Sequence, residues 1–468
     1  MITRKEADSI GTMEVPMKAY YGVQTLRAKK NFHITGRPLH PEFIKNLVRI
    51  KKAAAYTNMT AHILDEKIGN AIVKACDEII EGKLHSQFIV DAIQGGAGTS
   101  ANMNANEVIA NRAIEILGGE KGDYTIVHPN DHVNMAQSTN DVIPSAGKLT
   151  ILALLPGLLE QLERLHKALR DKSIEFDDVV KMGRTQLQDA VPIRLGQSFE
   201  AYAAVIERDI RRIRSLDSEI KVLNIGATAV GTAINVNPVY LFHIIRNVNL
   251  VCGTDCSQAE DLFDATQNLD GFVHTSAALR VCAVNLSKIC NDLRLLSSGP
   301  KAGLGEINLP PKQNGSSIMP GKINPVIPEA VSQVAYNVIG NDVTVTMAAE
   351  AGQLELNAFE PVIFYKIFES IDTLRGAVET LIDNCILGIT ANRERCRALV
   401  ESSAALATAL CPALGYKKSA EIAKKCNRTG IPVRQIVLEE GLLPEEELDR
   451  YLSLVDMTQA GHPVDYKL

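Results

Sequence analysis

The sequence has no excess of positive charge. Its 49 lysine and arginine residues are outnumbered by 55 aspartate and glutamate residues, which gives a formal net charge of −6. Proteins that bind nucleic acids or anionic membrane surfaces usually carry clusters of basic residues, and no such cluster stands out here. The composition therefore predicts neither a nucleic acid nor a membrane as a partner.

Long hydrophobic runs are also missing. The longest run, from Leu149 to Leu159, has 11 residues and is interrupted by Pro156 and Gly157, whereas a helix that crosses a bilayer needs about 20. The opening stretch MITRKEADSIGTMEVP lacks the apolar core of a secretory signal peptide. We therefore expect a cytoplasmic protein.

Paired cysteine and histidine patterns are absent from the sequence. The nine cysteines include Cys252 and Cys256 in a C-x3-C spacing, but no second pair nearby completes a zinc site. An odd number of cysteines in a large chain is typical of free, mostly buried thiols. We expect no metal site, no cysteine nucleophile and, because no cofactor motif is visible, no organic cofactor.

Alternating strand patterns are scarce, whereas helical patterns are strong. Residues 151–169 and 199–223 repeat large apolar side chains every three or four positions, which indicates long bundle helices. Pro156 should kink or disturb the first of them. Further helical segments cover residues 273–296, 326–350 and 361–388. These five segments predict an all-α fold with a central long five-helix bundle.

The length of 468 residues allows about three domains at ~150 residues each. We predict a mainly helical N-terminal domain (1–138, with helices near 41–59, 65–81 and 104–117), a central helical bundle domain (139–393) and a small helical C-terminal domain (394–468). In the last, Pro444 should occupy the first position of a helix, followed by three glutamates. Residues 326–347 are apolar on more than one helix face, so we also predict that subunits associate.

Four loops next to the predicted helices carry polar residues. In QGGAGTSANMNANE (94–107), backbone N–H groups and Thr99 sit at a helix start, which suits an anion, although a simple helix cap is the plainer reading. Ser138, Thr139 and Asn140 either cap the following helix or hydrogen-bond a bound carboxylate. Thr185 and Gln186 lie in a predicted loop, where residues of their kind are more often structural.

The fourth loop, between Gly299 and Pro328, contains eleven glycine and proline residues. It is long for a compact helical domain, and it carries apolar residues such as Ile318 and Met319 that a disordered linker would lack. These features favour a lid that closes over a site. The lid bears Ser316 and Lys322; taken alone, Lys322 would be interpreted as a surface lysine.

The lid sequence GSSIMPGKINP (315–325) resembles the signature GSSxxPxKxNP of the aspartase/fumarase superfamily. GGAGTSANMNANE, QSTND, KMGRTQLQDAVP, YYGVQTLRAKKNF and the tail GY…TG…VR…L resemble its other shared blocks, so the resemblance covers essentially the whole chain. TQLQDAVP, QSTND and AGQLELNAFEPV, with Glu360 before Pro361, resemble the aspartases more than the fumarases.

This resemblance implies a carbon–nitrogen lyase that reversibly converts L-aspartate to fumarate and ammonia without a cofactor, although Mg²⁺ activates some members. It also implies a homotetramer whose active sites are shared between three subunits. Ser316 would be the base that removes the β-proton. Lys322 and Asn324 would bind the α-carboxylate. The remaining substrate-binding residues would be Thr99, Ser138, Thr139, Asn140, Thr185, Gln186 and Met319.

Gln186 departs from many relatives, which have a histidine there. In the fumarases the resemblance implies that this histidine pairs with a glutamate, here Glu329, and helps to position water. We assign Glu329 a supporting role. The missing histidine weakens the case for a hydratase and means that a neutral amide faces the substrate carboxylate.

The chemistry explains why such residues are needed. Removing a proton next to a carboxylate gives a doubly charged aci-carboxylate, which preorganised donors must stabilise. A serine can act as base only if its alkoxide is stabilised, here by N–H groups of the Ser316–Gly321 turn and by Lys322. Gly315 and Gly321 are expected to adopt positive φ in that turn.

Two other functions stay open at this point. A fumarate hydratase would share most of the blocks, although Gln186 and QSTND argue against it. A catalytically silent structural homologue would share the fold, although the intact set of Ser316, Lys322 and Asn324 argues against it.

Overall fold

The computed structural model describes residues 2–459, and the chain groups into two compact units. Unit 1 comprises Met1–Leu159, Arg211–Ala283 and Tyr336–Arg375, and unit 2 comprises Glu160–Ile210, Val284–Ala335 and Gly376–Leu468. All five boundaries between them fall inside long helices. The division into three domains stays a prediction.

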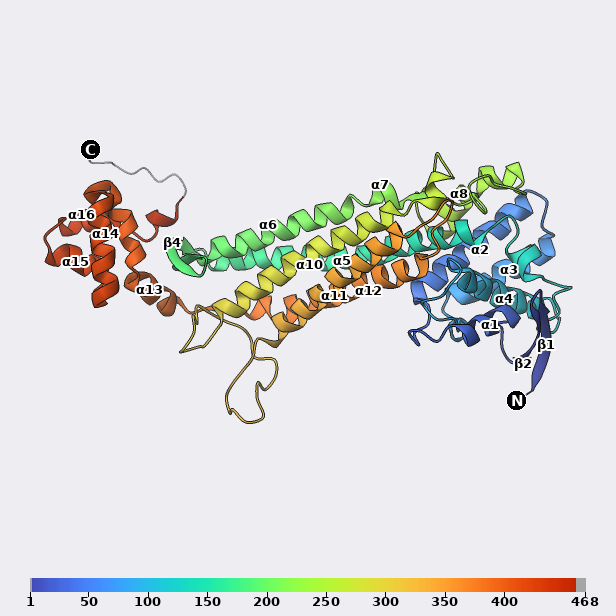
Figure 1. Cartoon of the computed structure of the whole chain (residues 1–468), viewed down its shortest axis with the longest axis horizontal. Coiled ribbons are helices and arrows are strands. Elements are labelled where there is room, and N and C mark those ends of the chain that lie inside the picture. Colours follow the sequence, from blue (N-terminus) through green and yellow to red (C-terminus); the bar gives the residue numbers. More distant parts are fainter. Residues whose placement is uncertain (1, 460–468) are drawn as a thin grey trace. The chain divides into compact units, whose positions relative to one another are not determined.

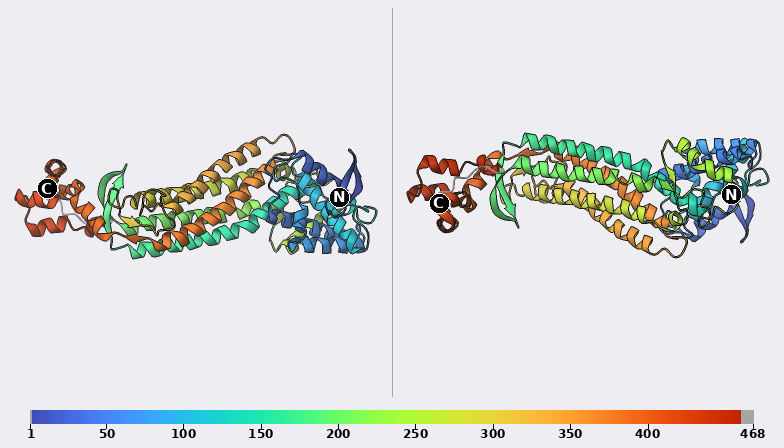
Figure 2. Two further views of the ribbon diagram at one scale, coloured as in Figure 1. Left: turned by 90° about the horizontal axis from the view of Figure 1, so that it is seen from below. Right: turned by 90° about the horizontal axis from the view of Figure 1, so that it is seen from above.

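The five predicted bundle segments all form helices, although the second ends at Arg214 rather than at residue 223 and the fifth ends at Asn384 rather than at residue 388. They are α5 (Thr139–Glu175), α6 (Leu195–Arg214), α10 (Asp270–Leu296), α11 (Val326–Glu350) and α12 (Glu360–Asn384). They lie side by side in both figures (Figures 1 and 2). In unit 2, Tyr202 of α6 bonds Asp292 of α10, and in unit 1 Asn341 of α11 bonds Ser370 of α12. The predicted helical bundle is therefore confirmed.

Helix α5 runs without a break through Pro144 and Pro156, so the expected disturbance at Pro156 does not end the helix. Its most apolar 18-residue window has a mean hydropathy of 1.7, which a membrane span could also have, but 67% of that window is buried inside the protein. Two further helical segments, Arg393–Ser402 and Ala404–Thr429, are long and apolar enough for a membrane span only if they are counted together, and the chain bends by 68° between them. The burial of α5 is that of a core helix.

Helix α11 has apolar side chains on two faces, as predicted. Val331, Ala335 and Val338 are 1% exposed. On another face, Tyr336, Val343 and Met347 are 58%, 55% and 66% exposed.

Unit 1 also contains shorter helices and two small sheets. The helices are α1 (Val23–Asn31), α2 (Pro41–Thr60), α3 (Glu66–Ile80), α4 (Thr99–Ile116), α7 (Asp217–Ile220), α8 (Pro238–Cys252) and α9 (Asp264–Gln267), with a short 3₁₀-helix η1 (His85–Gln87) and a short π-helix η2 (Pro129–Val133). Strands β1 (Thr3–Asp8) and β2 (Gly11–Pro16) form an antiparallel hairpin, and β5 (Val222–Leu223) pairs in parallel with β6 (Ser257–Gln258). The N-terminal hairpin and α8 were not predicted.

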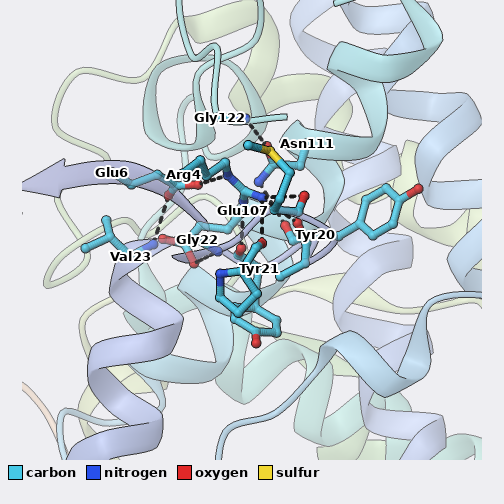
Figure 3. Close-up of polar contacts among 12 residues, drawn as sticks. Arg4, Glu6, Tyr20, Tyr21, Gly22, Val23, Glu107, Asn111 and Gly122 are labelled. Atoms are coloured by element: carbon cyan, nitrogen blue, oxygen red, sulfur yellow. Dashed lines mark hydrogen bonds and ion pairs between the residues drawn. The ribbon is translucent and has the colours of Figure 1, made fainter. Parts of the chain in front are cut away.

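A buried polar cluster ties the start of the chain to α4 (Figure 3). Glu107 of α4 accepts hydrogen bonds from the backbone N–H groups of Gly22, Gln24 and Thr25 and from the Thr25 hydroxyl, at 2.6 to 3.1 Å. These groups lie at the N-terminus of α1, which has no side-chain cap of its own. Glu107 therefore caps α1 from a distance in sequence.

Unit 2 carries the remaining elements. They are the hairpin β3 (Val180–Thr185) and β4 (Gln188–Arg194), the pair β7 (Ile307–Asn308) and β8 (Thr390–Ala391), helices α13 (Arg393–Ser402), α14 (Cys411–Thr429), α15 (Val433–Glu439) and α16 (Glu445–Tyr451), and short η3 (Ile386–Gly388), η4 (Ala404–Leu410) and η5 (Asp456–Thr458) turns. Pro444 is the N-cap of α16, one position before the predicted one.

Candidate active site

The glycine loop before α4 is built from left-handed backbone. Gly96, Ala97 and Gly98 have φ values of 80°, 54° and 89°, a conformation that glycine adopts without steric cost. Helix α4 starts at Thr99, five residues before the predicted start at Asn104. The loop thus places the predicted Thr99 at a helix N-terminus.

Most N–H groups at this helix start are already bonded. Thr99 N–H donates to Gly96 O, Ala101 N–H to Gln94 Oε1, and Asn102 N–H to Gly98 O. Among residues 2–459, the Ser100 N–H has no acceptor. The exposed Thr99 hydroxyl donates to Gly96 O at 2.7 Å. Its proton is used there, so its oxygen faces outward as an acceptor.

Buried Asp141 shapes the Ser138–Asn140 turn. Its Oδ1 accepts from Ser138 N–H at 2.9 Å, and its Oδ2 accepts from Gly226 N–H and Thr228 N–H at 3.0 and 3.2 Å. Burial raises the pKa of Asp141 to about 6, against the opposing effect of these hydrogen bonds. Asp141 therefore joins the turn to residues 226–228.

Neighbouring side chains hold Thr139 and Asn140. Asn102 Nδ2 of α4 donates to Thr139 Oγ1 at 3.2 Å, so the structure brings the predicted Thr139 to the helix that begins with Thr99. Asn140 Nδ2 donates to Ala229 O at 2.7 Å. Its Oδ1 accepts no hydrogen bond within the described part of the chain.

Thr185 and Gln186 belong to a β-hairpin, which corrects the predicted loop. Thr185 ends β3 and pairs with Gln188, and Gln186 and Leu187 form the two-residue turn with φ values of 54° and 62°. Such turns usually carry Asn-Gly or Asp-Gly, and Gln-Leu gives no such signal. All four residues from Thr185 to Gln188 are exposed.

Buried ion pairs fix this hairpin in unit 2. Glu306, which is 0% exposed, accepts from Arg184 Nη1 at 2.9 Å and lies 3.3 Å from Lys181 Nζ. Burial lowers the pKa of Lys181, and the nearby Glu306 charge opposes that shift. Because Glu306 stands on the segment that leads into the lid, these pairs link the base of the hairpin to the base of the lid.

The lid holds Ser316 in a tight turn. Ser316 Oγ accepts hydrogen bonds from Ile318 N–H at 3.2 Å and from Met319 N–H at 3.1 Å. Two backbone N–H groups therefore point at the oxygen of the predicted base, as the sequence suggested. This environment favours negative charge on that oxygen.

Two hydrogen bonds join the two ends of the lid turn, Gly315 on one side and Lys322 and Asn324 on the other, which we call the neck of the lid. Gly315 N–H donates to Lys322 O at 2.9 Å, and Asn324 Nδ2 donates to Gly315 O at 2.8 Å. Gly321 has φ of 80° as predicted, but Gly315 is not among the positive-φ residues, so that prediction was wrong. Glycine is needed at 315 for space, because a Cβ there would lie 2.1 Å from Lys322 O.

The predicted residues fall into two sets. Thr99, Ser138, Thr139 and Asn140 lie in unit 1, and Thr185, Gln186, Ser316, Met319, Lys322, Asn324 and Glu329 lie in unit 2. Met319 and Lys322 are exposed on the lid, and Glu329 lies in the first turn of α11. Sequence reasoning missed the supporting Asp141, although it lies inside the QSTND block. It placed Asn102 among exposed polar groups, whereas Asn102 is 2% exposed and supports Thr139 from inside.

Metal ligands were not expected. No group of three or more His, Cys, Asp or Glu side chains within residues 2–459 is placed to hold a metal ion. The nine cysteines are free thiols and most are buried.

Comparison with known proteins identifies the family. A family model described as "Lyase" matches residues 11–340, and one described as "Fumarase C C-terminus" matches residues 406–459. Aspartate ammonia-lyase of Bacillus subtilis (strain 168) is 53% identical over 98% of this chain and 96% of the relative. The chain belongs to the aspartase/fumarase superfamily.

Other superfamily members are similar over the same length. Aspartate ammonia-lyase of Escherichia coli (strain K12) is 48% identical over 98% of this chain and 97% of the relative. The crystal structure of "fumarate lyase:delta crystallin" from Brucella melitensis bound to cobalt is 51% identical, with a TM-score of 0.95 over 98% of this chain and 100% of the other. Class II fumarase from Schistosoma mansoni is 34% identical, with a TM-score of 0.94 and the same coverage.

Proposed function

We propose that this chain is an aspartate ammonia-lyase, which converts L-aspartate to fumarate and ammonia reversibly. Aspartate ammonia-lyases from several bacteria are about half identical to it over nearly its full length. The observation that carries the chemistry is the Ser316 oxygen with two N–H groups directed at it. An alkoxide there is stabilised without any proton transfer at the moment of reaction.

The reaction then proceeds in balanced steps. The Ser316 alkoxide takes the β-proton of aspartate, and the electron pair left behind moves into the β-carboxylate to form the aci-carboxylate. The pair returns to form the C=C bond as the C–N bond breaks, and ammonia leaves with the electrons of that bond. Ser316 afterwards loses its proton to solvent.

The polarity of the unit 1 residues suits the two ends of this substrate. The Thr99 oxygen and Asn140 Oδ1 are acceptors and face the ammonium group. Thr139 accepts from Asn102, so its own O–H is left to donate to the β-carboxylate. Ser138 joins Thr139 as a donor.

Lys322 and Asn324 bind the α-carboxylate. Lys322 is exposed on the lid and supplies the positive charge, while Asn324 donates one Nδ2 hydrogen to Gly315 O and keeps the other for the substrate. Thr185, Gln186 and Met319 complete the substrate contacts, with Glu329 in support.

Subunit association follows from the same reasoning. The exposed apolar face of α11, with Tyr336, Val343 and Met347, needs a partner. We propose a homotetramer in which each site takes residues from three subunits, and light scattering of the purified protein tests the tetramer. We also propose a cytoplasmic location, tested by cell fractionation, and turnover without a cofactor, tested by dialysis against a chelator.

A direct assay tests the function. Fumarate absorbance should rise when the protein is mixed with L-aspartate and stay flat with L-malate. Turnover of malate alone would identify a hydratase instead. Ser316→Ala should lower kcat by at least about 10³-fold, and unchanged fumarate production would remove Ser316 from the role of base. Inactivity of the intact protein toward both substrates would favour a structural homologue.

A further inference from the structure

Helix α2 carries a lysine that is fully buried. Lys51 is 0% exposed, and its Nζ donates one hydrogen bond, to Asn134 Oδ1 at 2.7 Å. A buried lysine is costly and is seldom kept without a specific partner. None of the proposed steps uses Lys51 or Asn134.

Asn134 collects several donors on one oxygen. Its Oδ1 accepts from Lys51 Nζ, from Asn102 Nδ2 at 3.3 Å and from Asn106 Nδ2 at 3.2 Å. Its own Nδ2 donates to Gln137 O at 3.1 Å. Lys51 and its neighbours therefore determine which way the Asn134 amide faces.

Asn102 links the Asn134 amide to Thr139. Its Nδ2 donates both to Asn134 Oδ1 and to Thr139 Oγ1, at 3.3 and 3.2 Å. Its buried Oδ1 has no hydrogen-bond partner within the described residues. The direction of the Asn102 amide therefore depends on Asn134 and Thr139 alone.

We propose that Lys51 is a positioning residue that, through Asn134 and Asn102, directs the Thr139 hydroxyl proton toward the substrate carboxylate. This proposal rests on the proposed function, because it concerns the same site. Asn134 Oδ1 accepts from both Lys51 Nζ and Asn102 Nδ2, and Asn102 Nδ2 also donates to Thr139 Oγ1. The Thr139 proton is then free to point outward.

The reverse arrangement would disable Thr139. If the Asn102 amide turned over, its Oδ1 would accept the Thr139 proton and leave only a hydroxyl oxygen facing a carboxylate. Lys51 prevents this because its Nζ donates to Asn134 Oδ1 and so holds that acceptor oxygen opposite Asn102 Nδ2. Burial lowers the pKa of Lys51 to about 7, opposed by the charge of Asp141. The neutral amine retains N–H groups that donate to Asn134.

A double-mutant cycle tests the chain. Thr139→Val should lower kcat for L-aspartate about 100-fold. Lys51→Met should lower kcat about tenfold with little change in KM, because the lost donor acts mainly on the more highly charged aci-carboxylate. In the Thr139→Val background, Lys51→Met should have no further effect. An equal tenfold loss in that background would overturn the proposal.

Two further variants separate positioning from folding. Lys51→Gln keeps an N–H donor and should recover most of the activity that Lys51→Met loses; an equal loss in both would refute the donor role. Should Lys51→Met fail to fold, Asn134→Ala removes the same link and should show the same dependence on Thr139.

Lys172→Met provides the matched control. Lys172 is a buried lysine of unit 2 that bonds Ile389 O at 2.8 Å and touches no proposed site residue. The Lys172→Met variant should keep the kcat of the intact protein. A tenfold loss in this variant would mean that replacing any buried lysine by methionine lowers kcat, whatever its partners. If the intact protein does not deaminate aspartate, the proposed function fails; if it does and the cycle is additive, only the Lys51 proposal fails.

Discussion

Replacing Gly315 by alanine should open the neck of the lid. The added Cβ would lie 2.1 Å from Lys322 O and 2.7 Å from Lys322 C, so the two backbone segments must separate. Separation breaks the Gly315 N–H to Lys322 O bond of 2.9 Å and the Asn324 to Gly315 O bond of 2.8 Å. At about 1 kcal/mol each, the loss is about 2 kcal/mol, which corresponds to a roughly 30-fold lower kcat/KM for L-aspartate.

Fumarate absorbance provides the assay, and a glycine in the same loop provides the comparison. Gly321 has φ of 80° but open space around it, so Gly321→Ala meets only the left-handed backbone penalty of about 1 kcal/mol and should lose about fivefold. Gly376→Ala, inside α12 with nothing within 4 Å, should lose nothing. Thermal unfolding should barely change in either lid variant, because the lid is exposed. Full activity of Gly315→Ala would refute the claim that this closed neck matters.

Three other changes should alter stability. The pKa of Lys51 is about 7 in the folded protein and 10.5 in its ordinary state, so the unfolded chain binds the extra proton between about pH 7 and pH 10. The free energy of unfolding of the intact protein, relative to that of Lys51→Met, should therefore rise by about 1.4 kcal/mol per pH unit in this range. Urea unfolding at about pH 7.5 and 9.5 measures this difference, and a difference that stays constant would contradict the prediction. Glu107→Gln should destabilise unit 1 by roughly 2–3 kcal/mol because one amide oxygen replaces two carboxylate oxygens that accept four donors; an unchanged midpoint in denaturant would argue against the remote cap. Leu187→Asn should stabilise the hairpin by roughly 0.5–1 kcal/mol, because asparagine tolerates the φ of 62° and Leu187 is 71% exposed; a lower Tm would show that Leu187 makes a contact worth more than its strain.

The helical part of the fold was predictable because it depends on periodic burial. The apolar stripe at 151–169 is buried by α5, and the stripe at 199–223 is buried by α6 as far as Ile213. Its last members, Leu216, Ile220 and Leu223, are also buried but lie beyond the end of α6 at Arg214. Helix ends were less certain. Helix α4 begins at Thr99, five residues before the predicted start, because the left-handed residues 96–98 turn the chain there. The hairpin at Thr185 was missed because its turn uses Gln-Leu.

In the candidate site, too, local features could be predicted from the sequence, and contacts between distant segments could not. The base role of Ser316 came from the family resemblance, whereas its backbone N–H partners could be predicted because the Ser316–Gly321 turn is local. The supporting contacts of Asn102 and Asp141 could not be predicted because their partners, Thr139 and residues 226–228, are far away in sequence. The role of Gly315 was misjudged because steric exclusion by Lys322 O depends on a contact across the loop.

The three left-handed residues before α4 leave one backbone amide, that of Ser100, unoccupied within the described chain. An amide in this position exchanges its hydrogen readily with solvent and slows once an anion settles on it. Deuterium uptake at Ser100 would thus report when the helix end has received its ligand, even in a variant too slow to make product.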